Sequence, residues 1–494
     1  MGPSPKLRRT KTSDPDDEPI IRLACQVKDY SFGKKGSRSL VARYALANEK
    51  EGHFKVDEEQ AYGEIWIGGH RDSPSQSFET SVHLTTLIEQ SPAAFLTHDI
   101  ATKYSGPGNS PRLPFNFKVL SFDKILPLQV HPDRSLAEKL QNRDTNRAFA
   151  DLNHKPGVVI ALSPRFDSFV GFRPIEEIKC FLQDVEELRE LLVDEVQNIT
   201  NAAEGQVDNQ LRDVFGKLSK KEKSQIEKLT KKLLGRIQKE GNKALGEIGE
   251  RDELGDMAQK VWRQHPGDPG LFAAVFFLKL LTLKRGEGVV VPPGCIHAYI
   301  DGDILECIAN GDNVLSRSFQ GRAEPPEVPG LFEELLLHNP TPAEHLILQQ
   351  KPFSRSRNSH TAAYNALLDE FSLLKVSLDR AEEEFFSIDG PALYVVTAGE
   401  VEVSARVRPS HSQQAEDIRR DSDTPGPREA VASEGGHVPL LRRGSECSRT
   451  GEEGQKEHLS EGMCVFVKPG YEVGFWNKGG GKAEIHAAYC EVDK

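Results

Sequence analysis

The stretch LPLQVHPDRSLAEKL at residues 126–140, read with VVVPPGCIHAY at residues 289–299, carries the most information about the fold of this chain. In the first stretch Gln129 and His131 stand two positions apart in a strand-like run, which places their side chains on one face of a pleated strand. In the second, His297 follows an apolar run and a Pro-Pro-Gly turn. An amide oxygen and two imidazoles can bind the same metal ion. Together the stretches predict a metal site built on β-structure.

Either motif alone is weak, because a Gln-x-His triplet more often marks an ordinary half-buried strand. Four separated blocks strengthen the prediction: YGEIWIGGH (62–70), FKVLSFDKILPLQVHPDRSLAEKL (117–140), NHKPGVVIALSPRFDSFVGFRP (153–174) and GCIHAYIDGDILECIANGDNV (294–314). In this order they resemble type I mannose-6-phosphate isomerases, and the resemblance runs with gaps from about Ile20 to the C-terminus. It implies a mixed, mainly β fold, with cupin-type β-barrels (a bicupin) and a helical insertion domain.

Length and composition are compatible with a multidomain enzyme without pointing to one, and they argue against nonspecific nucleic-acid binding. A chain of 494 residues exceeds one ordinary core, and 63 basic against 75 acidic residues give a formal charge of −12. The seven cysteines show no CxxC spacing, which argues against a thiolate zinc site or a disulfide scaffold. No stretch reaches the roughly 18 to 20 apolar residues of a membrane span. We expect a cytoplasmic monomer with a small-molecule sugar phosphate as its partner, without nucleic acid or membrane.

The hydrophobic pattern changes twice along the chain and divides it into domains. Short apolar runs bounded by turn residues predict an N-terminal catalytic barrel, followed by charge-rich stretches with helical spacing that are most simply a solvated helical surface. An apolar helix then leads into a strand at residues 288–292. The expected units are a disordered tail (1–19), the N-terminal barrel (20–175, with strands from about 284–325), the helical domain (176–283) and a C-terminal barrel (326–494) with a disordered insertion (about 408–459).

The resemblance implies a chemistry as well as a fold. In the family, the positions of Gln129, His131 and His297 bind zinc, so we expect one Zn²⁺ per chain. Moving a proton between C1 and C2 of a hexose phosphate requires stabilisation of an oxyanion, a proton shuttle and a hold on the phosphate. A zinc ion with an open position meets the first requirement. The implied reaction interconverts mannose 6-phosphate and fructose 6-phosphate and feeds GDP-mannose synthesis.

Two positions depart from the family pattern. Gly157 stands where the family has a zinc-binding glutamate, directly after the NHKP motif. Ser316 stands where the family has a catalytic arginine, and Arg317 follows one residue later. On a regular strand that displacement turns the Arg317 side chain to the opposite face, whereas a β-bulge would return it to the site as a catalytic residue.

The remaining family positions are matched. His154 and Lys155 match residues implicated in proton transfer, although Lys155 could instead simply bind substrate oxygens. A lysine beside a cation has a lowered pKa, which suits acid/base catalysis. Lys118, Tyr299 and Glu306 are the expected substrate-binding residues.

Two further residues receive no functional role from the sequence. Glu64 also matches the family, without an assigned role, and His486 in the C-terminal barrel is expected to be structural.

Two classes of function follow. The resemblance favours an active isomerase. Gly157 and Ser316 favour the alternative, a catalytically impaired paralogue that binds a sugar phosphate or a protein partner. A metal-dependent oxygenase is disfavoured, because the two-histidine, one-carboxylate set that iron prefers is missing.

Overall fold

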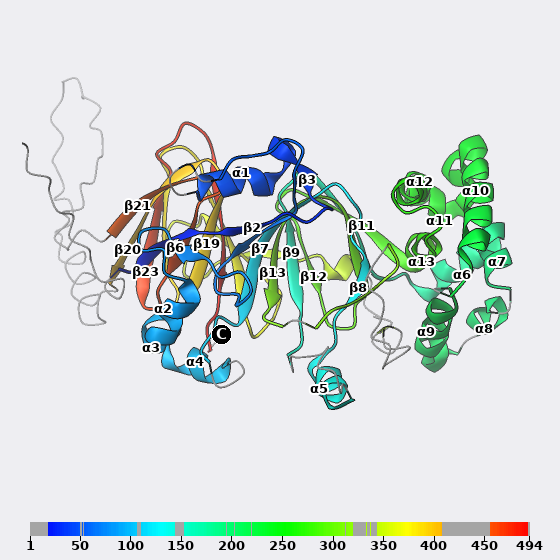
Figure 1. Cartoon of the computed structure of the whole chain (residues 1–494), viewed down its shortest axis with the longest axis horizontal. Coiled ribbons are helices and arrows are strands. Elements are labelled where there is room, and N and C mark those ends of the chain that lie inside the picture. Colours follow the sequence, from blue (N-terminus) through cyan, green and yellow to red (C-terminus); the bar gives the residue numbers. More distant parts are fainter. Residues whose placement is uncertain are drawn as a thin grey trace, which may run out of the picture.

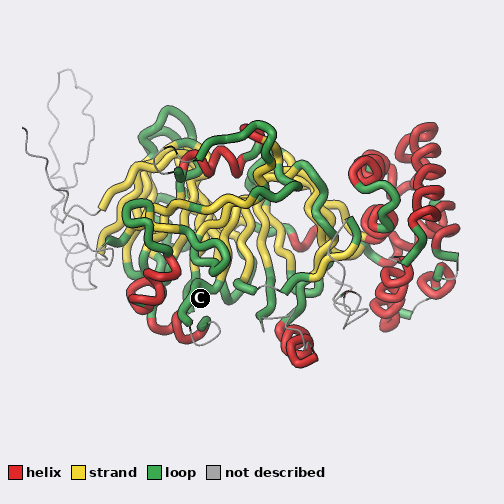
Figure 2. The backbone as a smooth tube through the Cα atoms, in the orientation of Figure 1, coloured by secondary structure: helices red, strands yellow, loops and turns green. Residues whose placement is uncertain are grey.

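The computed structural model describes residues 18–492 except 50–51, 53, 106–109, 144–152, 194, 202, 219, 312, 320–331, 333–335, 337–342 and 408–454. Strands occupy most of its length, and the helices α6–α13 form a separate group at one end (Figures 1 and 2). This arrangement confirms the predicted mixed, mainly β fold with a helical insertion. The expected tail at 1–19 lies outside the described residues apart from its last two positions.

The N-terminal barrel is one ten-stranded sheet. Its strands alternate so that one side chain in two faces the barrel interior. They are β2 (Gln26–Lys28), β5 (Glu64–Ile67), β7 (Phe115–Phe122), β8 (Leu128–Val130), β9 (Gly157–Ala161), β10 (Arg165–Phe172), β11 (Leu278–Lys284), β12 (Gly288–Val291), β13 (His297–Ala309) and β14 (Leu315–Arg317). Strands β3 (Lys34–Lys35) and β4 (Ala61–Tyr62) form a separate two-stranded sheet. The same part of the chain forms the helices α1 (Leu40–Ala47), α2 (Leu84–Gln90), α3 (Pro92–Leu96), α4 (His98–Lys103) and α5 (Arg134–Arg143), of which α1 packs on the N-terminal sheet and α3 on the C-terminal barrel.

A group of helices runs from Ile175 to Phe277. Its helices are α6 (Ile175–Asp184), α7 (Glu186–Leu191), α8 (Val196–Thr200), α9 (Val207–Leu218), α10 (Lys223–Glu240), α11 (Gly246–Arg251), α12 (Leu254–Gln264) and α13 (Gly270–Phe277). Residues 278–283, expected to be helical, form β11 and pair with β10. Within the described ranges, none of the helices combines the length and apolar character that a membrane crossing requires.

The C-terminal barrel packs an eight-stranded sheet against a four-stranded one. The first contains β1 (Ile20–Ala24), β6 (Gln76–Ser77), β15 (Gln350–Pro352), β16 (Thr361–Tyr364), β17 (Ser372–Leu378), β19 (Ala392–Ala398), β22 (Cys464–Val467) and β24 (Ala483–Tyr489). The second contains β18 (Glu383–Ser387), β20 (Glu400–Val407), β21 (Gln455–Ser460) and β23 (Tyr471–Trp476).

Two of the predicted domain boundaries differ from those in the structure. Strand β1, expected in the N-terminal barrel, pairs with β22 at the other end of the chain. The insertion expected at about 408–459 stops before β21, which begins at Gln455; residues 408–454 lie outside the described part.

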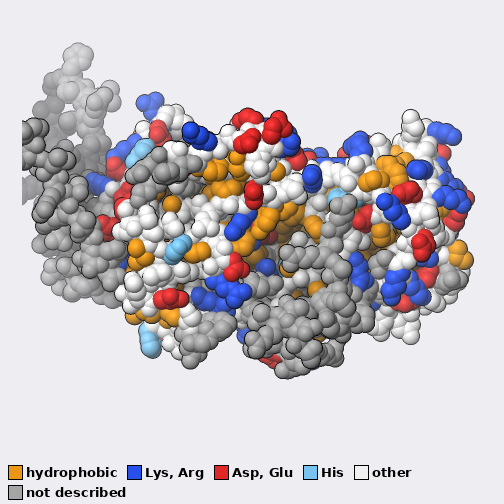
Figure 3. Space-filling view, in the orientation of Figure 1, with side chains coloured by type: hydrophobic (Ala, Val, Ile, Leu, Met, Phe, Trp, Pro, Cys, Tyr) orange, Lys and Arg blue, Asp and Glu red, His pale blue; other side chains and the backbone are white. Residues whose placement is uncertain are grey.

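Both faces of the N-terminal sheet are covered, which is why its strands read as nearly continuous apolar runs. The outward face of β7, β9 and β13 packs on the C-terminal barrel through residues such as Val158 and Leu305. The outward face of β8 and the first half of β13 packs on the helical domain through residues such as Leu128 and Ile296. On the face shown in Figure 3, basic and acidic side chains are interspersed.

Candidate active site

The alternation along β8 decides which side chains enter the N-terminal barrel. Leu128 and Val130 belong to the hydrophobic core shared with the helical domain, and both are buried. Gln129 lies between them in the strand, so its amide faces the other way, into the barrel. The prediction that Gln129 faces inward follows from this simple period of two.

His297 lies directly across from Gln129. Strand β13 pairs with β8 at this one position, and the neighbouring Ile296 and Ala298 belong to the outward core. His131, one residue beyond the end of β8, brings its ring to 5.2 Å from the His297 ring, measured between centroids. The amide and the two imidazoles that the sequence singles out are therefore together at the mouth of the barrel.

Both imidazoles are held by the backbone in the same tautomer. His131 Nδ1 lies 3.1 Å from the carbonyl oxygen of Asn313, and His297 Nδ1 lies 3.1 Å from that of Cys295. Because a carbonyl oxygen only accepts, each Nδ1 carries the hydrogen, and each Nε2 keeps its lone pair. This is the second-sphere arrangement that orients metal-binding histidines.

Electrostatics keep the same two rings neutral. Burial and the charge of Lys155 lower the pKa of His131, and burial lowers the pKa of His297 to about 4. A neutral imidazole is the form that binds a metal ion.

The donor set fits a zinc ion. Two neutral imidazoles and an amide give three protein ligands, the number found in catalytic zinc sites that keep a position open. Among the described residues, no three histidine, cysteine, aspartate or glutamate side chains are grouped so that they could hold a metal ion. With the two histidines, Gln129 would supply the third donor.

An irregularity in the pairing of β13 turns two further side chains towards the barrel interior. The strand pairs with β10 up to Asp301 and with β7 from Gly302 onward. The pairing with β10 skips Ile300, because Tyr299 lies opposite Ser168 and Asp301 lies opposite Asp167, so the side-chain alternation shifts at this β-bulge. As a result Tyr299 and Glu306 both face inward, and the Tyr299 hydroxyl donates to Glu306 Oε1 over 2.9 Å.

Charged groups cluster beside that pair. Lys118 lies opposite Glu306 on β7, 3.5 Å from Glu64 Oε2 and 4.1 Å from the centroid of the Trp66 ring. Burial raises the pKa of Glu306, although the charges of Lys118 and Lys155 oppose the shift. Lys155 thus acts electrostatically on both histidines and on this carboxyl group, so it lies near all three.

The register of strand β14 shows whether Ser316 or Arg317 faces the candidate site. It pairs with β8 in regular register, with Ser316 opposite Gln129 and Arg317 opposite Leu128. The Arg317 guanidinium lies 5.2 Å from the ring of Phe332, a residue of the helical-domain core. Ser316 therefore shares the face of the site, and Arg317 does not; the bulge that would return Arg317 is not formed.

Gly157 begins β9 and is closed in by a neighbour. It pairs with Ile308 of β13, and a Cβ added at Gly157 would lie 2.8 Å from Cγ2 of Ile308. Real Cβ atoms do not approach that closely. The branched side chain of Ile308 therefore occupies the space that a side chain at position 157 would need.

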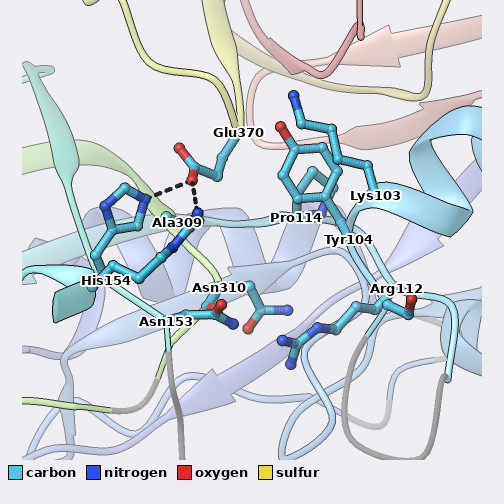
Figure 4. Close-up of a pocket in the computed structure, with 11 residues that line it drawn as sticks. Lys103, Tyr104, Arg112, Pro114, Asn153, His154, Ala309, Asn310 and Glu370 are labelled. Carbon is cyan, nitrogen blue, oxygen red and sulfur yellow. Dashed lines mark hydrogen bonds and ion pairs between the residues drawn. The ribbon is translucent and has the colours of Figure 1, made fainter. Parts of the chain in front are cut away.

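His154 turns away from the barrel. Its neighbour Lys155 acts on the buried histidines, whereas His154 Nε2 lies 2.6 Å from Glu370 Oε1 in a separate cavity outside the barrel (Figure 4). The sequence analysis missed Glu370, which is 216 positions away from His154, as well as the cation–π partner Trp66.

Fold and site define a two-barrel protein of the cupin type, with an amide and two neutral histidines on one face of the first barrel. Comparison with known proteins shows the family to which it belongs. The family model for the catalytic domain of type I phosphomannose isomerase matches residues 20–175, and the model for the helical insertion domain matches residues 188–278.

Relatives and solved structures agree with this match. The chain is 34% identical to mannose-6-phosphate isomerase of Ogataea parapolymorpha over 77% of this chain and 87% of that protein, and 30% identical to that of Saccharomyces cerevisiae over 77% and 88%. The crystal structure of a mannose 6-phosphate isomerase bound with zinc and yttrium has a similar fold, with a TM-score of 0.69 and 21% identity over 96% of this chain and all of that one. The chain belongs to the type I mannose-6-phosphate isomerase family.

Proposed function

We propose that this chain is a zinc-dependent isomerase that interconverts mannose 6-phosphate and fructose 6-phosphate. The observation that carries the proposal is the pair of histidines whose Nδ1 atoms are held by backbone carbonyls beside the inward-facing Gln129. In this role it would act in the cytoplasm and feed GDP-mannose synthesis.

The metal would be held by Gln129, His131 and His297, one ion per chain. When bound, zinc supplies a Lewis acid for the oxygens at C1 and C2 of the sugar. The hydrogen bonds to Asn313 and Cys295 hold both rings in the required tautomer before any ion arrives.

Proton transfer is the task of Lys155 and Glu306. Lys155 lies close enough to both histidines to lower the pKa of each, so it stands beside the metal-binding groups. Glu306 is buried with a raised pKa, which lets a carboxyl group exchange a proton nearer to neutral pH. We assign the transfer between C1 and C2 to Lys155, with Glu306 as the second proton-handling group.

Substrate recognition falls to the inward-facing charged and hydroxyl groups. Lys118 is buried, so its ammonium group would meet the phosphate or a sugar oxygen in a setting of low dielectric constant. Tyr299 is held by Glu306 and lines the same interior. His154 and Arg317 face other surroundings, and the proposal gives neither of them a role in the reaction.

Metal content and turnover of the purified full-length chain test the proposal together. We expect one zinc per chain and conversion of mannose 6-phosphate to fructose 6-phosphate, with kcat reduced by on the order of 10² or more in Lys155→Gln. Replacing the exposed His98 by alanine is the matched control and leaves both readouts unchanged. Bound zinc without turnover would overturn the isomerase assignment in favour of a sugar-phosphate-binding protein.

A further inference from the structure

A second cavity, of about 130 Å³, lies outside the barrel and shares no lining residue with the proposed active site. It is bounded by the end of α4, the segment before β7, the start of α5, the end of β13 and Glu370 of the C-terminal barrel. Pockets for drug-sized ligands measure about 300–1,000 Å³, so an occupant of this cavity is small.

The lining carries an excess of positive charge. Lys103, Arg112 and Arg134 contribute three cations, against the single carboxylate of Glu370. That carboxylate is already paired, since it accepts from His154 at 2.6 Å and lies 3.9 Å from Arg134. Burial opposes its ionisation, but the hydrogen bond and charge of His154 and the charge of Arg134 outweigh burial and lower its pKa.

The Arg112 guanidinium has hydrogen-bond donors that no described residue accepts. It is half-buried, and among the described residues it makes no hydrogen bond or ion pair. A guanidinium presents a planar fork of donors that matches the oxygens of a phosphate or carboxylate. Holding such a group beside other cations is unfavourable unless an anion binds among them.

Neutral polar groups adjoin the guanidinium. Figure 4 shows Arg112 with the amide groups of Asn153 and Asn310 on one side of the cavity, and Glu370 with His154 on the other. Asn153 is fixed by its hydrogen bond to the carbonyl oxygen of Asn310, 3.2 Å away. Amides and a carboxylate around a cationic centre suit a ligand that carries hydroxyl groups besides its anion.

We propose that this outer cavity binds a small phosphorylated metabolite. The phosphate meets the Arg112 guanidinium, Lys103 adds positive charge to the cavity, and the hydroxyl groups meet the asparagine amides and Glu370. A divalent cation is excluded as the occupant by the three cations that line the cavity.

Inorganic phosphate is the probe for the test, measured by equilibrium dialysis of the radiolabelled ion against the full-length chain at constant ionic strength. We expect the double variant Lys103→Gln, Arg112→Gln to weaken phosphate binding by about tenfold or more, as the loss of charge-assisted hydrogen bonds implies. Arg112→Lys, which keeps the charge but loses the fork, should give a smaller loss. Arg263→Gln, an exposed change on α12, serves as the control.

The barrel offers a competing position for phosphate, and Lys118→Met separates the two sites. We expect Lys118→Met to keep the phosphate binding that the double variant loses, because Lys118 does not line the outer cavity. Loss in Lys118→Met with retention in the double variant would overturn the proposal, as would equal loss in Arg263→Gln or a parent that binds no phosphate. Because dialysis does not depend on turnover, an inactive enzyme that binds phosphate through Arg112 refutes the isomerase assignment but not this site.

Discussion

Restoring the family carboxylate at position 157 requires two changes, because Ile308 occupies the space that the new side chain needs. A Cβ at Gly157 would lie 2.8 Å from Ile308 Cγ2, whereas carbon atoms in contact lie about 3.5–4.0 Å apart. Ile308 is branched at its own Cβ and stiff, so the methyl group cannot easily rotate away. We expect Gly157→Glu alone to lower the free energy of unfolding by about 1–3 kcal/mol, the usual cost of overpacking.

The compensating change is Ile308→Leu, which moves the branch one carbon outward and conserves volume. Such swaps cost less than about 1.5 kcal/mol. In the double variant the glutamate has room, and its carboxylate should tighten zinc by about tenfold or more, since even residues that only support a ligand are worth about 10 to 100-fold.

The assays are thermal unfolding in a chelator and zinc competition against a chromophoric chelator. Ile304→Leu combined with Gly157→Glu is the matched control, because Ile304 is also buried on β13 but pairs with Ala161 instead of Gly157. A single Gly157→Glu variant that is as stable as the parent would refute the packing argument. A double variant with unchanged zinc affinity would show that position 157 does not reach the metal.

Three further predictions concern individual histidine, arginine and serine side chains or pairs of them. Changing His131 and His297 together to alanine should abolish zinc binding, and stoichiometric zinc in that variant would sink the ligand assignment. Arg317→Ala should change kcat less than twofold, while Ser316→Arg, which adds a cation on the face of Gln129, should raise kcat by on the order of 10²; the reverse result would show that β14 is bulged in solution. Burial holds the pKa of His486 at about 3, below the 6.5 of an unfolded chain, so the unfolded state binds the extra proton and stability falls as the pH drops from 6.5 towards 3. Urea unfolding at pH 7.5 and pH 5 should show this loss in the parent and a smaller one in His486→Gln.

Short-range periodicity predicts the centre of the candidate site well. Gln129 and His131 face one way because strands alternate, and His297 joins them because β13 pairs with β8 at Gln129. The same rule, applied to β14, separates Ser316 from Arg317. These positions depend on one or two neighbouring strands, which the motifs themselves define.

Features that depend on distant pairing or on a local irregularity could not be predicted in this way. The β-bulge between Tyr299 and Asp301, which brings Glu306 inward alongside Tyr299, cannot be seen in a pattern of alternating residues. His154 faces Glu370, a residue of the other barrel, and nothing near either residue signals the contact. Residues 278–283 look like the continuation of an apolar helix, but pairing with β10 makes them a strand.

Strand β1 is synthesised early but can pair with β22 only after most of the chain has been made. Ile20 donates its backbone N–H to the side chain of Gln455, 435 positions later, and β1 lies between β6 and β22 in its sheet. While the chain is being made, this strand leaves the ribosome long before its partner β22 exists, with unpaired backbone groups and apolar side chains exposed. The closing of the second barrel is therefore a late, non-local step that makes folding slow. A fragment that ends before Cys464 would keep β1 as an open edge, inviting other chains to pair with it.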